Sequence, residues 1–328
     1  MESERKELSE KIRKKTTIPE EYLEIARSYL ENPAEYVQEF VCTINGKLRH
    51  ITTYAKGEKG LDLRKLHTWF SKEIKGRYTS SRYSFAYKKG SNILKCVEWH
   101  TSSSAFLKAD IHAYFDSIRH DLLVKRIMKS KTCRESREEY ELIIRACFFD
   151  GKVPIGFISS PVLSDIYLSG LDNKYSKIGD ICYTRYADDF IISSDNKDVL
   201  SGVRARLEED LLEYGLELNK KKTYIRELKH VGDSIHVLGI NLVREEAGSN
   251  RLTISDKYLR AISMEYGKWM KNRQSTDAEN EQLPKLKGMI RFVRDCSEDS
   301  YQKLRKIVSI KCGEDIADLM EGNRRQKK

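Results

Sequence analysis

The sequence lacks any apolar run long enough to cross a membrane. A spanning helix needs about 18 to 20 apolar residues, and no stretch of the 328 residues approaches that length. The opening stretch, MESERKELSEKIRKKTTIPEEYLEIA, is charged and contains no apolar signal region. These two absences predict a protein that is neither exported nor inserted into a membrane, and we expect it in the cytoplasm.

Closely spaced cysteines are absent as well. The seven cysteines lie far apart, and no two of them form a C-x-x-C pair. An odd number of scattered cysteines argues against a zinc site and against a disulfide framework. We therefore expect seven reduced thiols without a chemical role.

Acidic residues are outnumbered by basic ones. The chain carries 60 Lys and Arg against 50 Asp and Glu, a formal net charge of +10. Such an excess favours a polyanionic partner such as nucleic acid, although a soluble basic protein would show it too. A length of 328 residues suggests two or three packed subdomains, and the 39% of hydrophobic residues predicts that the chain folds.

Apolar periodicity indicates helices and strands in a mixed order, without a repeat or a long linker. A helix is expected before residue 32, a hairpin around Asn45 and Gly46, and a helix over residues 61–74. A strand, several helices and a second hairpin follow between residues 105 and 198, then a helix, strands near 224 and over 237–243, and helices after Ser255. This order predicts an α+β sandwich in which helices back one antiparallel sheet.

Acidic residues interrupt two apolar runs that otherwise resemble buried strands. Asp188 and Asp189 lie within YTRYADDFII, and Asp110 ends FLKAD. Burying unpaired carboxylates costs several kcal/mol, so such acids usually hold a cation or meet a positive partner. If the two strands pair, Asp110 and Asp188 face one another, an arrangement that suits magnesium and phosphoryl or nucleotidyl transfer. An Asp-Asp pair elsewhere would indicate only a surface turn.

With several motifs in order, the sequence resembles the bacterial reverse transcriptases, close in layout to those of retrons and group II introns. FLKADIHAYFDSI is similar to their palm motif A, GFISSPVLSDIYLSGLD to motif B, YTRYADDF to motif C and GLELNKKKT to motif D. VLGINL resembles the primer grip, and LKGMIRFVRDCSEDSYQKL resembles the first thumb helices. Ordered motifs of this kind are far more specific than any one alone.

The resemblance implies an α+β right-hand polymerase with fingers, a ferredoxin-like palm and a helical thumb. On that basis the expected parts are a helical lead-in (1–35), fingers (36–100), a palm with finger elements inserted (101–245), a helical thumb (246–320) and a basic tail (321–328).

The resemblance also implies a metal site and a catalytic mechanism. Asp110 and Asp188 would ligate two Mg²⁺ ions, for which Mn²⁺ could substitute, with the Ile111 carbonyl and Asp189 beside them. A primer 3′-hydroxyl would then attack the α-phosphate of an incoming nucleotide. Lys222 matches the motif D lysine that protonates the leaving pyrophosphate, and Lys221 is the alternative register.

Residues that bind the nucleotide are implied in the same way. Phe115 occupies the place of the aromatic gate that excludes a 2′-hydroxyl, which favours deoxynucleotides. Arg49, Lys88 and Lys89 lie in the fingers region, where the family uses basic side chains on the triphosphate. Gly156 of motif B is also assigned to substrate binding.

The chain departs from the family pattern at three places. Ile155 stands before Gly156 where Gln is usual, so a polar contact near the nucleotide is lost. Asn92 and His100 have the wrong spacing for the retron element before motif A, and Leu238 replaces an expected Thr. A defence-associated or unclassified bacterial reverse transcriptase therefore fits as well as a retron enzyme.

The leading functional hypothesis is RNA-directed DNA synthesis on a dedicated noncoding RNA in antiphage defence. The expected partners are that RNA as template or primer, dNTPs, the DNA product, and either an effector protein or further copies of the chain. No maturase, endonuclease or RNase H-like region is visible. Three alternatives stay open: template-independent or protein-primed DNA synthesis, a non-catalytic RNA-binding scaffold, and an RNA-dependent RNA polymerase, which Phe115 disfavours.

Overall fold

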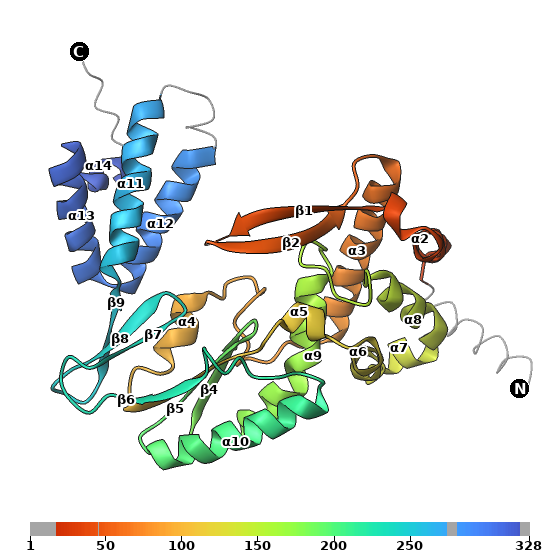
Figure 1. Ribbon diagram of the computed structural model, residues 1–328, viewed down its shortest axis with the longest axis horizontal. Coiled ribbons are helices and arrows are strands. Elements are labelled where there is room, and N and C mark those ends of the chain that lie inside the picture. The colour runs from red at the N-terminus through yellow and green to blue at the C-terminus, as the bar shows by residue number, and fades with distance from the viewer. Residues whose placement is uncertain (1–17, 45, 274–280, 322–328) are drawn as a thin grey trace, which may run out of the picture. The chain divides into compact units, whose positions relative to one another are not determined.

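A computed structural model describes residues 18–44, 46–273 and 281–321 (Figure 1). Contacts divide the chain into two compact units, each assembled from separate segments. The first contains the described residues up to Ser91, Ala109–Phe190 and Ser201–Tyr224. The second contains Asn92–Lys108, Ile191–Leu200 and the described residues from Ile225 onward. Residues 1–17 of the predicted lead-in and 322–328 of the predicted tail lie outside the described residues.

The first unit contains an antiparallel hairpin and a group of helices. Strands β1 (Val37–Ile44) and β2 (Lys47–Tyr54) pair along their whole length, which confirms the predicted hairpin, although residue 45 of its turn is not described. The helices of this unit are α2 (Glu20–Glu31), η2 (Pro33–Glu35), α3 (Glu58–Arg77), α5 (Tyr114–Ser117), α6 (His120–Ile127), α7 (Lys131–Glu135), α8 (Arg137–Ala146), α9 (Ser160–Tyr175) and most of α10 (Lys197–Glu213).

Helix α3 buries one face, as its sequence pattern predicts. Leu63, Leu66, Phe70 and Ile74 recur every three or four residues and are fully buried. Since Arg64, Lys65 and Lys72 between them are exposed, burial of this stripe fixes the rotation of the helix about its axis.

His67, on the same face of α3, connects four parts of the first unit. The Tyr54 hydroxyl accepts a hydrogen bond from the Ile158 amide (2.8 Å) and lies 2.9 Å from His67 Nδ1. The hydroxyl therefore donates its proton to Nδ1, and Nε2 donates to the Ala146 carbonyl at 3.1 Å. Burial lowers the His67 pKa to about 4, so the ring is neutral at physiological pH. Strand β2, helix α8 and the loop before α9 are thereby held to α3.

A four-stranded sheet carries the acidic motifs. Its order is β4 (Cys182–Tyr186), β5 (Asp189–Ser194), β3 (Ala105–Asp110) and β6 (Tyr224–Glu227). Helix α9 packs against β4 (Figure 1). Helix α10 is joined to α9 through Asp210, which accepts hydrogen bonds from Lys174 and Tyr175. The predicted α+β arrangement, a sheet backed by helices, is confirmed.

The second unit contains a three-stranded antiparallel sheet and five helices among the described residues. The sheet order is β7 (Ser234–Val237), β8 (Ile240–Arg244) and β9 (Asn250–Ile254). Ser255 caps the first long helix of this unit by accepting a hydrogen bond from the Tyr258 amide, as the sequence predicts. The helices are α4 (Ile93–Glu98), α11 (Asp256–Asn272), α12 (Leu283–Cys296), α13 (Glu298–Cys312) and α14 (Ile316–Glu321).

The expected single strand over residues 237–243 is wrong. Strand β7 ends at Val237, β8 begins at Ile240, and these two residues pair directly. Leu238 and Gly239 between them have φ values of 50° and 89°. Two consecutive residues with positive φ form the tight turn of a hairpin, which ends a strand that apolar content alone would continue.

Two expectations from composition can be compared with the structure. None of the seven cysteines, all of which lie within the described residues, forms a disulfide bond. Within the three described segments, no helix combines the length and the apolar character that crossing a membrane would require.

Candidate active site

The hairpin of β4 and β5 presents the acidic pair at its tip. Strands β4 and β5 are neighbours in the sheet (Figure 1). Strand β4 ends at Tyr186 and β5 begins at Asp189, so Ala187 and Asp188 form the turn. Ala187 has φ 57°, a left-handed conformation that costs roughly 1 to 2 kcal/mol for a residue with a Cβ atom. The fold therefore maintains a strained turn at this tip.

Asp110 meets this turn from the neighbouring strand. It is the last residue of β3, which lies beside β5, and it is 4% exposed. The amide of Ile111 donates a hydrogen bond to the Asp188 carbonyl at 3.2 Å. The predicted juxtaposition of Asp110 with Asp188 is therefore present, and Asp189 follows at the first position of β5.

The two carboxylates affect each other electrostatically. Burial raises the pKa of Asp188 above its ordinary value, and the negative charge of Asp110 raises it further. The positive charges of Lys222 and Arg49 oppose this rise without cancelling it. A cation bound between the carboxylates would relieve the repulsion, and hard carboxylate oxygens are the ligands that Mg²⁺ prefers. The donor set therefore fits the predicted metal.

The described side chains do not complete a metal site by themselves. Among the described residues, no group of three His, Cys, Asp or Glu side chains is arranged to hold a metal ion. Any metal at Asp110 and Asp188 would need further oxygen ligands from the backbone, for which Ile111 was the predicted source, or from substrate phosphates.

Lys222 makes an ion pair with Asp110. Its Nζ atom lies 2.5 Å from Asp110 Oδ2. The loop that carries it is held to the end of β3, because the Asn219 amide donates to the Asp110 carbonyl at 2.7 Å. Of the two registers considered from the sequence, the structure brings Lys222 to the carboxylate.

Three other residues predicted to bind substrate lie on different elements of the first unit. Arg49 lies on β2, close enough for its charge to act on Asp188. Phe115 lies in α5, with its ring centroid 5.6 Å from that of Tyr114. A Cβ atom on Gly156 would lie 2.4 Å from the Thr52 carbonyl oxygen, so this loop passes directly against β2.

Lys88 and Lys89 lie in a different environment. They line a cavity of about 480 Å³ together with Lys75, Lys129 and Asp165. Lys88 Nζ donates to the Ser81 carbonyl. Among the charges that act on Lys88, that of Asp165 favours its protonated form and partly offsets the effect of burial, which lowers its pKa. The structure therefore associates these lysines with α9.

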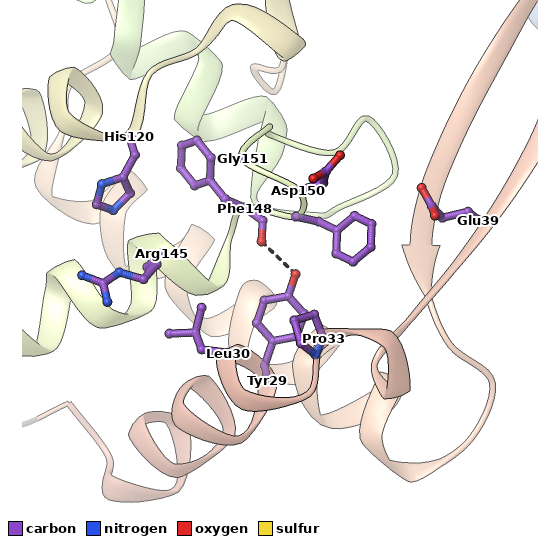
Figure 2. Close-up of a pocket in the computed structure, with 10 residues that line it drawn as sticks. Tyr29, Leu30, Pro33, Glu39, His120, Arg145, Phe148, Asp150 and Gly151 are labelled. Carbon is purple, nitrogen blue, oxygen red and sulfur yellow. Dashed lines mark hydrogen bonds between the residues drawn. The ribbon is translucent and has the colours of Figure 1, made fainter.

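A second cavity, of about 700 Å³, lies at α2, α8 and the 149–152 turn (Figure 2). His120 and Arg145 lie on one side of it, and Glu39 and Asp150 lie on the other (Figure 2). None of the residues that line it belongs to the predicted site. The acidic motifs and this cavity are separate features of the first unit.

Four residues near the turn were not predicted as site residues: Tyr87, Asp165, Asp172 and Arg185. The charge of Asp188 acts on Tyr87, whose pKa rises to about 12, mainly through burial. A signal for Tyr87 was present in the aromatic and basic tract RYTSSRYSFAYKKG. For Arg185 the signal was a charged residue inside an apolar strand.

Comparison with known proteins identifies a family and relatives that match most of this chain. A profile of the reverse transcriptase (RNA-dependent DNA polymerase) family matches residues 46–242. The chain is 27% identical to the retron Ec83 reverse transcriptase of Escherichia coli over 235 residues, 67% of this chain and 72% of that protein. It is 24% identical to the retron Ec86 reverse transcriptase of Escherichia coli over 259 residues, 76% of this chain and 73% of that protein.

A solved structure shows the same fold at low sequence identity. Apo telomerase from Candida tropicalis superposes with a TM-score of 0.52 and 12% identity, over 88% of this chain. The match covers 60% of the telomerase chain, so this protein corresponds to only part of it.

Proposed function

This chain belongs to the reverse transcriptase family of RNA-dependent DNA polymerases, and we propose that it copies a dedicated noncoding RNA into DNA. Its right-hand polymerase fold and its enzyme class, a nucleotidyltransferase, follow from that membership. The observation that carries the proposal is the meeting of Asp110 and Asp188 at the end of β3, with Lys222 paired to Asp110.

We assign the chemistry to these groups. Asp110 and Asp188, with Asp189 and the Ile111 carbonyl, would hold two Mg²⁺ ions, and Mn²⁺ is the alternative metal. Bound there, the metal would polarise the α-phosphate and stabilise both the attacking and the leaving oxygen. Lys222 would supply a proton to the leaving pyrophosphate. Its ammonium group makes an ion pair with Asp110.

Substrate selection is assigned to the residues around this centre. Phe115 would exclude a 2′-hydroxyl by steric clash, and Arg49 would contact the triphosphate, in keeping with its effect on Asp188. Gly156 would allow the loop before α9 to approach the nucleotide closely. Lys88 and Lys89 would also contact the triphosphate, from the cavity that they line beside α9.

The biological setting is proposed from the relatives. Two similar proteins are retron reverse transcriptases of Escherichia coli, which favours a partner RNA that serves as template and primer. Antiphage defence, a cytoplasmic location, an effector protein or a homo-oligomer, and the fingers, palm and thumb boundaries stay predictions from the sequence.

The test is to purify the protein from its host and sequence the co-purifying RNA and DNA separately. The wild type is compared with Asp188→Ala and with Asp180→Ala, which removes an exposed acid shortly before β4. We expect one defined RNA with its complementary DNA in the wild type and Asp180→Ala, and RNA without DNA in Asp188→Ala. DNA without a complementary RNA would support untemplated synthesis instead. DNA that persists in Asp188→Ala would exclude this active site.

A further inference from the structure

Arg185 is a fully buried arginine three residues before Asp188. It lies in strand β4 and is 1% exposed. A buried guanidinium group is costly unless its N–H groups find partners and its charge is balanced. The hydrogen-bond partners of the Arg185 guanidinium group therefore indicate its role.

The guanidinium group connects helix α9 to the acidic turn. Nε and Nη2 form a bidentate pair with Asp172, at 2.8 and 2.7 Å, and Nη2 also contacts Asp165 at 2.9 Å. Nη1 donates to the Ala187 carbonyl at 2.9 Å. Burial lowers the pKa of Arg185, but the negative charges of Asp172 and Asp165 raise it by more. The pKa of Arg185 therefore lies well above its ordinary value.

The two aspartates are themselves held in place. They are seven residues apart on α9, two helical turns, and therefore share one face of the helix. Asp172 is fully buried and accepts a further hydrogen bond from the Tyr183 hydroxyl at 2.7 Å. Asp165 accepts hydrogen bonds from the hydroxyl groups of Ser80 and Ser84. Both carboxylates are therefore oriented by hydrogen bonds from groups other than Arg185.

The Ala187 carbonyl is the informative contact. It belongs to the peptide that joins Ala187 to Asp188, so its direction determines how Asp188 is presented. Ala187 holds a left-handed φ, a conformation that persists only where surrounding contacts enforce it. A planar guanidinium group anchored on two carboxylates can enforce it, whereas the flexible ammonium group of Lys has no such fork.

The backbone of Arg185 fixes a second segment. Its amide donates to the Tyr83 carbonyl and its carbonyl accepts from the Phe85 amide, both at 2.8 Å. That segment leads to Tyr87, on which the charge of Asp188 acts. One residue therefore joins helix α9, the 80–87 segment and the acidic turn.

We infer that Arg185 is a positioning residue, which holds the Ala187–Asp188 peptide in the orientation that lets Asp188 bind metal. The inference rests on the proposed function of Asp188 and adds a group that does not itself touch metal or substrate. The group acts through the main chain, in the way that outer contacts orient metal ligands.

The decisive variant is Arg185→Lys, which keeps a positive charge but loses the fork. Mn²⁺ binding to the protein with its co-purified RNA is measured by electron paramagnetic resonance without nucleotide, and primer extension is measured against Mg²⁺ concentration. We expect Mn²⁺ affinity to fall about tenfold and the half-saturating Mg²⁺ concentration to rise about tenfold. We also expect excess metal to restore part of the rate.

Asp210→Asn is the matched control. Asp210 is a buried acid of the same unit, and it accepts hydrogen bonds from Lys174 and Tyr175 at the end of α9, neither of which belongs to the Arg185 network. Its replacement should lower the melting temperature without changing either metal dependence. If Arg185→Lys changes metal dependence no more than Asp210→Asn does at equal loss of stability, Arg185 is only a structural residue and the inference is wrong.

Two further variants keep the test decisive. If Arg185→Lys does not fold, Asp165→Asn is used instead, because it weakens one of the two carboxylate contacts of Arg185 at a partly exposed position. It should shift the metal dependence in the same direction by a smaller factor. An Asp165→Asn protein with wild-type metal dependence would overturn the inference. Asp188→Ala should abolish Mn²⁺ binding at this site. If Asp188→Ala binds Mn²⁺ as the wild type does, the proposed function is refuted. If Asp188→Ala loses Mn²⁺ binding but Arg185→Lys keeps wild-type Mn²⁺ affinity, only the positioning role of Arg185 is refuted.

Discussion

The fold opposes ionisation of Asp188. Burial and the charge of Asp110 both raise its pKa above the ordinary value of 3.8. In the unfolded chain Asp188 ionises near that ordinary value, while the folded chain retains the proton to higher pH. The free energy of unfolding therefore decreases as pH rises from the ordinary pKa to the raised one, and the whole cost is present above the raised pKa. A bound cation would remove that cost.

Replacing the ionisable group should stabilise the metal-free protein. In a chelator at neutral pH, Asp188→Asn should melt above the wild type, by roughly 2 to 4 °C for each kcal/mol of relieved electrostatic cost. The difference should shrink as pH falls toward 3.8, because wild-type Asp188 is then protonated. Mg²⁺ should raise the melting temperature of the wild type but not of the variant. Calorimetry with and without Mg²⁺ measures both effects.

Asp180→Asn is the control for this measurement, because the same substitution at an exposed acid should leave the melting temperature unchanged. A metal-free Asp188→Asn protein that melts below the wild type at neutral pH would show that the carboxylate stabilises the turn, contrary to the argument.

Residue-scale prediction succeeded where a side chain breaks a pattern. Asp110 and Asp188 stood out as acids in apolar strands, and their meeting followed from strand pairing. The roles of Asp165 and Asp172 could not be predicted in this way. Two acids on one helix are ordinary by sequence, and only the tertiary structure shows that both reach the buried Arg185.

At the scale of elements, the loop before α9 packs directly against the hairpin of β1 and β2. Gly156 lies under the backbone of β2, and a Cβ atom there would come within 2.4 Å of the Thr52 carbonyl and 3.0 Å of Thr53 Cβ. The Ile158 amide, two residues on, is bonded to the Tyr54 hydroxyl. Since the closest obstacle is backbone, neither side can yield by a simple rotamer change.

Gly156→Ala should therefore displace the loop or the hairpin. We expect a loss of about 1 to 3 kcal/mol in the free energy of unfolding, as for other overpacked sites. We also expect a fall of roughly a hundredfold in primer extension, because a shift of about 1 Å near reacting groups has that effect. Urea unfolding and single-turnover extension give the two numbers. Gly179→Ala, where nothing lies within 4 Å of the added atom, should change neither; wild-type activity in Gly156→Ala would refute the close approach.

Elements with a strong periodic pattern were predictable, and turns between apolar residues were not. The stripe on α3 and the Ser255 cap of α11 were present in the sequence and are confirmed. Leu238 did not predict a turn, because a branched apolar residue is unfavourable at φ 50°. The strained conformation depends on pairing between β7 and β8, which only the folded chain supplies.

For the whole molecule, the relevant quantity is the excess of positive charge. A formal net charge of +10 gives a protein that attracts nucleic acid over some distance and releases counterions when it binds. The cavity beside α9 concentrates four lysines, Lys75, Lys88, Lys89 and Lys129, around the single carboxylate that lines it, Asp165. If that cavity follows the RNA backbone, its lysines act on phosphates of the template and not on the triphosphate.

Salt should separate these two roles for Lys89. Fluorescence anisotropy with the co-purified RNA should show affinity falling linearly on a double-logarithmic plot between about 50 and 200 mM salt. If Lys89 contacts an RNA phosphate, Lys89→Ala should reduce the slope by about 1, whereas a triphosphate contact should leave the slope unchanged and raise KM for dNTP. Lys131→Ala, at an exposed lysine paired with Glu135, should alter neither quantity. A wild-type affinity that does not depend on salt would show that the positive charge plays no part in RNA binding.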